Sequence, residues 1–255
     1  MLAIAVILLI WFFCNQQEVV PAYMLPSPYD VVKAFAENCT IMMQQAAVTL
    51  QESVYGLGIG IALAFVVATL MDRFRFLHQA IYPILIITQT IPTIAIAPLL
   101  VLWMGFGMAP KITLVVITTF FPIAIGLLTG FQSVDADAIH LMQAMGANRY
   151  QIFRYVKLPN AAGDFFSGLR ISAAYAVVGA VVSEWLGGFE GLGVYMTRVK
   201  KAYAFDKMFA VIVFISVISL LLMAGVSLLQ KVSMPWNKPV EREHKKNRQT
   251  QRKES

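Results

Sequence analysis

Long uninterrupted apolar blocks constrain this chain more than any other feature. Five of them cover residues 46–71, 80–104, 112–131, 165–186 and 208–230. A helix needs about 20 residues to cross the hydrocarbon core of a bilayer, so each block is long enough to span it. Only 13% of the 255 residues are charged, whereas about a quarter are charged in ordinary globular domains. We therefore predict an all-α, polytopic integral membrane protein.

A sixth apolar segment, residues 2–13, is shorter than the other five. As a helix it would be about 18 Å long, which is less than a full span. It lacks the basic leader and the small-residue cleavage pattern of a signal peptide. We expect either a span whose beginning is missing here or a tilted, partly inserted anchor, which brings the prediction to about six transmembrane helices.

Basic residues indicate the orientation of these spans. When the C-terminus is placed inside, Arg73, Arg75, the basic residues of segment 145–163 and the tail all fall on the inner side. The cluster 198–207 argues weakly against this topology. The net charge of +6 comes largely from the tail, so we expect no nucleic-acid partner. We predict that residues 236–255 form a basic, disordered cytoplasmic tail, with contact to membrane lipids as the alternative.

Residue types that carry chemistry are scattered. Cys14 and Cys39 have no histidine nearby, and the three histidines lie far apart in the sequence, so neither a disulfide framework nor a metal site is predicted. No pair of acids stands with a histidine, and no nucleophile stands beside a base. We predict no catalytic residue, no metal and no cofactor bound by this chain.

Small residues and prolines distinguish two of the spans. Gly56 and Gly60 are spaced i, i+4, which allows a second helix to approach closely in lipid. In the span 80–104, Gln89 and Thr90 precede Pro92 and Pro98. Because proline frees backbone carbonyls, these must face protein or water. Such a span either lines a transport pathway or simply bends, and the residues alone leave both interpretations open.

A basic insert, residues 134–162, separates two of the spans. Asp135 and Asp137 suit a helix N-terminus, Gly146 divides the insert, and Pro159 is predicted to end its second helix. In that second helix, one face is predicted to be apolar (Ile152, Phe153, Val156) and the other polar (Tyr150, Gln151, Arg154, Lys157). Two short helices joined at a glycine fit an interfacial hairpin and a docking element for a soluble partner equally well.

The spacing in this insert resembles the cytoplasmic loop of ABC importer permeases. Gly146 is followed by nine residues and then by Val-Lys-Leu-Pro at 156–159, which matches the Gly-x9-Ile-x-Leu-Pro part of that loop. His140, Leu141 and Met142 stand where the family has Glu-Ala-Ala. Segments 25–35, 89–107 and 183–196 resemble the nitrate/taurine/sulfonate branch, and within it the permeases for the pyrimidine precursor of thiamine.

The resemblance implies a fold like that of type I ABC importer permeases, with a membrane domain over residues 1–235. It also implies a homodimer in a bacterial cell membrane, ATPase subunits that carry ATP-Mg, and an external substrate-binding protein. The ATPase-coupling loop would cover about 132–164 and include His140, Met142, Ala144, Gly146, Ala147, Arg149, Arg154, Val156, Leu158 and Pro159. The substrate pathway would include Gln89, Thr90, Pro92, Thr93 and Pro98.

The energy source lies outside this chain in either of the two leading interpretations. The sequence contains no Gly-x-x-x-x-Gly-Lys-Ser/Thr phosphate loop, so a partner ATPase or an ion gradient must drive transport. An ion-coupled secondary transporter would use intramembrane acids, for which Glu52 and Glu184 are the candidates. We expect both instead at the outer ends of their spans, in contact with headgroup water. The cargo stays open among thiamine-precursor pyrimidine, sulfonate, nitrate and riboflavin-like compounds.

Overall fold

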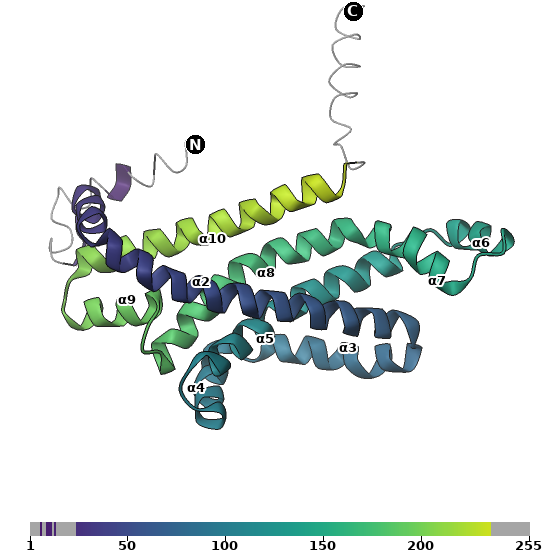
Figure 1. Cartoon of the computed structure of the whole chain (residues 1–255), viewed down its shortest axis with the longest axis horizontal. Helices are drawn as coiled ribbons and strands as arrows, with labels where there is room; N and C mark the ends of the chain where they lie inside the picture. Colours follow the sequence, from purple (N-terminus) through teal and green to yellow (C-terminus); the bar gives the residue numbers. More distant parts are fainter. Residues whose placement is uncertain (1–5, 7–8, 12, 14–23, 236–255) are drawn as a thin grey trace, which may run out of the picture.

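Long helices lie side by side along one axis of the molecule (Figure 1). The computed structural model describes residues 6, 9–11, 13 and 24–235, and every regular element in that part is helical. Most of segment 2–13 and the tail 236–255 lie outside the described residues, so the predictions for both stay predictions. Four helices are long and apolar enough to cross a membrane: α2 (Pro28–Arg73), α5 (Met108–Gln132), α8 (Leu158–Gly187) with the turns that precede it, and α10 (Phe205–Ser233).

A fifth candidate span is broken in two. The helices α3 (Arg75–Thr90) and α4 (Thr93–Met104) meet at an angle of 101°, so the span predicted over 80–104 contains the bend that its prolines indicated. Pro92 is the N-cap of α4, and Ile91 before it has extended backbone angles. The break follows from the clash that disfavours helical geometry in the residue before a proline. Pro98, in contrast, lies inside α4 without interrupting it.

The helix α2 begins well before the apolar block that predicts it. Its N-cap is Ser27, whose hydroxyl accepts a hydrogen bond from the backbone N–H of Asp30 at 3.2 Å. The Asp30 carboxylate in turn accepts from the backbone N–H of Ser27. This reciprocal capping box starts a polar stretch of helix that hydropathy alone does not reveal.

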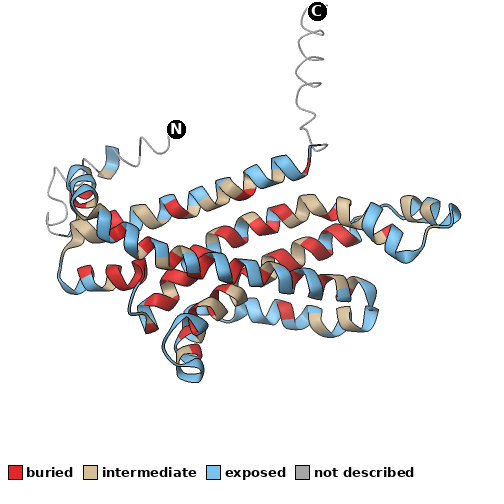
Figure 2. Ribbon diagram, viewed as in Figure 1, coloured by how far each residue is buried: buried red, intermediate tan, exposed pale blue. Residues whose placement is uncertain are grey.

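Buried residues concentrate where α2, α5 and α8 meet (Figure 2). Gly56 and Gly60 face α5, and a Cβ on either would collide with Val115 or Thr119. The predicted close helix contact at these two glycines is therefore confirmed. It brings α2 against α5 closely enough for side chains from both helices to meet.

Two short helical regions mark opposite ends of the bundle. At one end, α6 (Ala136–Ala144), α7 (Arg149–Ile152) and the π-helical turn η1 (Phe153–Lys157) form a protruding structure that we call the hairpin. At the other end, α9 (Leu192–Lys201) folds back between α8 and α10 (Figure 1). The sequence did not predict α9, because its ten residues form no apolar block.

Candidate functional site

The hairpin consists of two helices that meet at Gly146, as predicted. Asp135 caps α6 by accepting a hydrogen bond from the Asp137 backbone at 2.9 Å. Asn148 caps α7 in a capping box with Gln151. Gly146 has φ +82°, and no atom lies within 4 Å of the position that its Cβ would occupy. The turn thus depends on a backbone conformation that glycine adopts at little cost.

The second half of the hairpin runs directly into the membrane helix. Pro159 does not end it, contrary to the prediction, because α7, η1 and α8 form one continuous helical span from Arg149 to Gly187. The Leu158 N–H donates to the Phe153 carbonyl, five residues earlier. This widened π turn places Pro159 in the first turn of α8, where its missing N–H costs little.

The apolar and basic faces of the hairpin are partly as predicted. Ile152 is buried, and the ring of Phe153 lies 5.3 Å from that of Phe131 on α5. Lys157, predicted on the polar face, pairs with Asp72 on α2 at 2.7 Å and is therefore not free for a soluble partner. Among the residues expected to contact an ATPase, five are exposed, namely His140, Ala144, Gly146, Arg149 and Arg154, and five are half-buried, namely Met142, Ala147, Val156, Leu158 and Pro159.

A groove lies beside the break between α3 and α4. Its two adjoining parts have volumes of about 230 and 410 Å³, and Gln89 and Tyr175 line both. Thr93 lines the first part together with Thr118 from α5. Of the residues expected along the pathway, Gln89 and Thr93 therefore line the groove, whereas Thr90, Pro92 and Pro98 are not among its lining residues.

The opposite end of the bundle holds a buried polar cluster, which we call the α9 network. Glu52 on α2 and Glu184 on α8 are 0% and 2% exposed. Lys111 on α5 donates to Glu52 at 2.6 Å and to the Glu190 carbonyl at 3.4 Å. The expectation that both acids reach headgroup water is wrong. Lys111 on α5, Thr49 on α2 and the start of α9 supply their hydrogen-bond donors, and a carboxylate buried in this way needs such partners.

Glu184, which belongs to the preceding helix α8, also caps the start of α9. Its carboxylate accepts from the Gly193 N–H at 2.6 Å and from the Thr49 hydroxyl at 2.7 Å. Thr49 accepts from the Leu192 N–H, and Gln45 accepts from the Gly191 N–H. The first N–H groups of a helix have no partner within the helix, and here α2 and α8 supply the acceptors.

Sequence reasoning missed most of the α9 network and part of the groove. Thr49 lies 143 positions before Leu192, from whose backbone N–H it accepts a hydrogen bond, and Lys111 lies 79 positions before the Glu190 carbonyl to which it donates. A single sequence does not show pairing over such distances. One signal was available for Lys111, a lone basic residue at the start of an apolar block. Tyr175 gave no signal, because an aromatic residue in a membrane helix is ordinary.

Comparison with known families identifies the class of protein. A family model described as "binding-protein-dependent transport system inner membrane component" matches residues 56–236, which is more than half of the chain. The chain belongs to this family. It is an importer permease subunit of the bacterial inner membrane and crosses that membrane several times, as the hairpin spacing and the apolar blocks indicated.

Individual relatives agree with the suspected branch. The chain is 35% identical over 217 residues to the formylaminopyrimidine transport permease ThiX of Halalkalibacterium halodurans, covering 85% of this chain and 87% of that protein. It is 27% identical over 245 residues to the taurine transport permease TauC of Escherichia coli, covering 93% and 89%. An inward-facing structure of the MetNI methionine ABC transporter shares the fold, with a TM-score of 0.68, 20% identity and coverage of 76% and 96%.

Proposed function

We propose that two copies of this chain form the pathway of an ATP-driven importer for a small neutral nitrogen heterocycle, of the class to which formylaminopyrimidine belongs. In this proposal the hairpin docks on a separate ATPase subunit that carries ATP-Mg. An external binding protein delivers the cargo at the end where α9 lies.

The observation that carries the proposal is the continuous helical span from Arg149 to Gly187. One end of this span belongs to the hairpin, and its middle supplies Tyr175 to the groove. A displacement of the hairpin is thereby transmitted to the groove without any flexible linker. The arrangement supports coupling of a soluble motor to the pathway.

The chemistry of the groove supports an uncharged cargo. Its polar lining consists mainly of hydroxyl and amide groups, among them Gln89, Thr93, Thr118 and Tyr175. No lysine or arginine lines it within the described part of the chain, and its one ionisable carboxylate is that of Asp164. A sulfonate would meet no counter-charge there, whereas a pyrimidine finds hydrogen-bond donors and acceptors.

Exposed apolar side chains support the homodimer. Ile87 on α3 and Ile94 and Leu102 on α4 are 59%, 55% and 77% exposed, and they belong to the same broken pair that borders the groove. A second copy of the chain packed against α3 and α4 would cover part of this surface and close the groove on its open side.

The test is uptake in proteoliposomes that contain the permease, its ATPase and its binding protein. We expect ATP-dependent uptake of labelled formylaminopyrimidine and no uptake of labelled taurine. Uptake that needs no ATPase subunit would contradict the coupling, and taurine uptake at an equal rate would contradict the cargo class. Cross-linking of single-cysteine variants on α4 tests the dimer separately.

A further inference from the structure

A second groove lies at the root of the hairpin, away from the proposed pathway. It has a volume of about 600 Å³ and is bordered by the end of α2 on one side and by the hairpin on the other. Its apolar lining includes Leu70, Ile152 and Phe153, and its charged lining consists of Asp72, Arg73, Arg149 and Lys157. The proposed transport function uses neither Arg73 nor this volume.

The charges in this groove do not balance. Asp72 accepts two hydrogen bonds from Lys157, at 2.7 and 2.8 Å, and so neutralises it. Arg73 and Arg149 form no salt bridge with any acid in the described part of the chain. Two guanidinium groups therefore border an apolar hollow without a counter-ion. Guanidinium binds planar or tetrahedral oxyanions through paired N–H groups.

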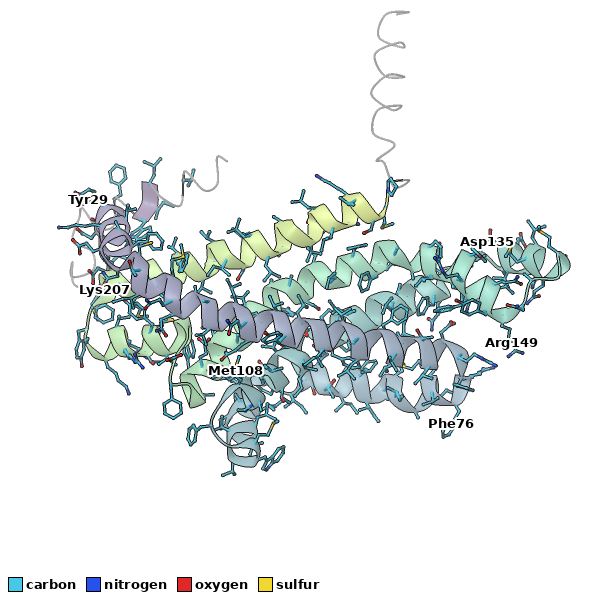
Figure 3. The ribbon with its side chains drawn as sticks, in the orientation of Figure 1. Tyr29, Phe76, Met108, Asp135, Arg149 and Lys207 are labelled. Carbon is cyan, nitrogen blue, oxygen red and sulfur yellow. The ribbon has the colours of Figure 1, made fainter. Side chains whose placement is uncertain are left out.

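The turn between α2 and α3 places the groove at the membrane surface. Phe74 in this turn and Phe76 at the start of α3 are 47% and 80% exposed, and the Arg73 guanidinium lies over the Phe74 ring at 5.3 Å. Aromatic and basic residues together at the end of a span are typical of the lipid headgroup level. Figure 3 shows Phe76 and Arg149 at the same end of the molecule.

One more polar group of the groove lacks a partner. The hydroxyl of Thr69 lines it, one helical turn before Arg73 on α2, and has no hydrogen-bond partner in the described structure. A hydroxyl and two guanidinium groups beside apolar walls match the two parts of a phospholipid, a phosphate ester and an acyl chain.

We propose that this groove binds an anionic phospholipid, with the phosphate between Arg73 and Arg149 and an acyl chain along Leu70 and Phe153. The negative lipid surface attracts such basic pockets. The lipid fills the space between α2 and the hairpin, so it supports the hairpin from the membrane side while the exposed surface of α6 stays free.

The experiment uses the assembled permease–ATPase complex, purified in detergent with phosphatidylglycerol or phosphatidylcholine and examined by native mass spectrometry. We expect retained phosphatidylglycerol to exceed phosphatidylcholine, and Arg73→Gln to lower the retained phosphatidylglycerol about fivefold. Arg75→Gln is the matched control, because Arg75 belongs to the same turn, is exposed and does not line the groove. It should retain lipid like the unmodified chain.

Four results would overturn the proposal. The first is equal retention of both lipids, and the second is an equal loss in Arg73→Gln and Arg75→Gln. The third is absence of lipid from the permease–ATPase complex when the permease purified alone retains it, which would assign the groove to the ATPase. Inorganic phosphate added at millimolar concentration should leave the lipid bound, and efficient competition by phosphate would also refute a lipid site.

Discussion

A lysine–carboxylate pair fastens α2 at each end of the bundle, and the two pairs have almost the same length. Lys111 and Glu52 are 2.6 Å apart near α9, and Lys157 and Asp72 are 2.7 Å apart at the hairpin. Their surroundings differ. The first pair is 6% and 0% exposed, whereas the second is 22% and 14% exposed. Burial, and not distance, decides how much the free energy of unfolding falls when one partner of the pair is removed.

The elements around the two pairs also differ in how firmly they are held. Near α9, side chains from α2, α5 and α8 hold backbone groups of one loop, so several bonds must break before α9 can move. At the hairpin, α6 has no buried residue at all. The end at α9 is held by several buried hydrogen bonds, whereas the hairpin end is exposed, as the proposed docking requires.

The largest expected effect comes from removing one member of the buried pair. Lys111→Met leaves Glu52 buried without its partner, which typically costs about 3–5 kcal/mol. We expect a large fall in thermal stability of the purified permease, measured by the loss of its folded fraction on heating. Lys157→Met is the matched control and should cost less, because that pair keeps partial contact with water. Equal losses of thermal stability in the two variants would show that burial does not distinguish the two ion pairs.

A smaller effect is expected from Glu184→Gln. The amide keeps the shape of the carboxyl group but turns one acceptor into a donor. That donor faces either the Gly193 N–H, which it cannot bond, or the Thr49 hydroxyl, which must then change from donor to acceptor. An unsatisfied buried group costs about 1–3 kcal/mol. Amides of residues 188–201 should exchange hydrogen faster. Glu190→Gln, at an exposed position, should leave the exchange unchanged, and protection that persists in Glu184→Gln would exclude a capping role.

At the hairpin, Gly146→Val tests the joint without touching the core. A β-branched residue at φ +82° is strained by about 1–3 kcal/mol, although space for the side chain is free. We expect normal insertion, with less ATPase subunit recovered or less uptake per ATP. Gly58→Val is the control, because its Cβ also meets open space and its backbone is helical. Unchanged recovery and unchanged coupling in Gly146→Val would reduce the hairpin to an interfacial element.

Single cysteine substitutions in the groove should change the stability of the permease least, and their reactivity tests whether the groove is the pathway. In a background without Cys14 and Cys39, Thr93→Cys should react with a small polar thiol reagent in intact membranes. Leu102→Cys, 77% exposed on the apolar side of α4, should not react, because lipid or a second copy covers it. If Thr93→Cys stays unreactive in every nucleotide state, the groove is not the pathway.

Sequence predicted the parts of this molecule that follow from local chemistry. Gly146, the capping residue Asp135 and the contact at Gly56 each depend on a spacing of a few residues. Pro159 was misjudged because a π turn accommodates it, and a π turn has no reliable local signature. Glu52 and Glu184 were misjudged because their partners lie on other helices, so only the packed bundle shows that their charges are buried.

In the proposed coupling, the unbroken span from Arg149 to Gly187 would act as a rigid lever. Its 39 residues correspond to about 58 Å at 1.5 Å per residue. A tilt of only about 5° displaces one end by about 5 Å when the other is fixed, roughly the pitch of one helical turn. Because the α9 network holds one end through Glu184, the proposed coupling would move the middle of this helix, and Tyr175 with it, when the hairpin is displaced. Such a movement would require no helix to unfold.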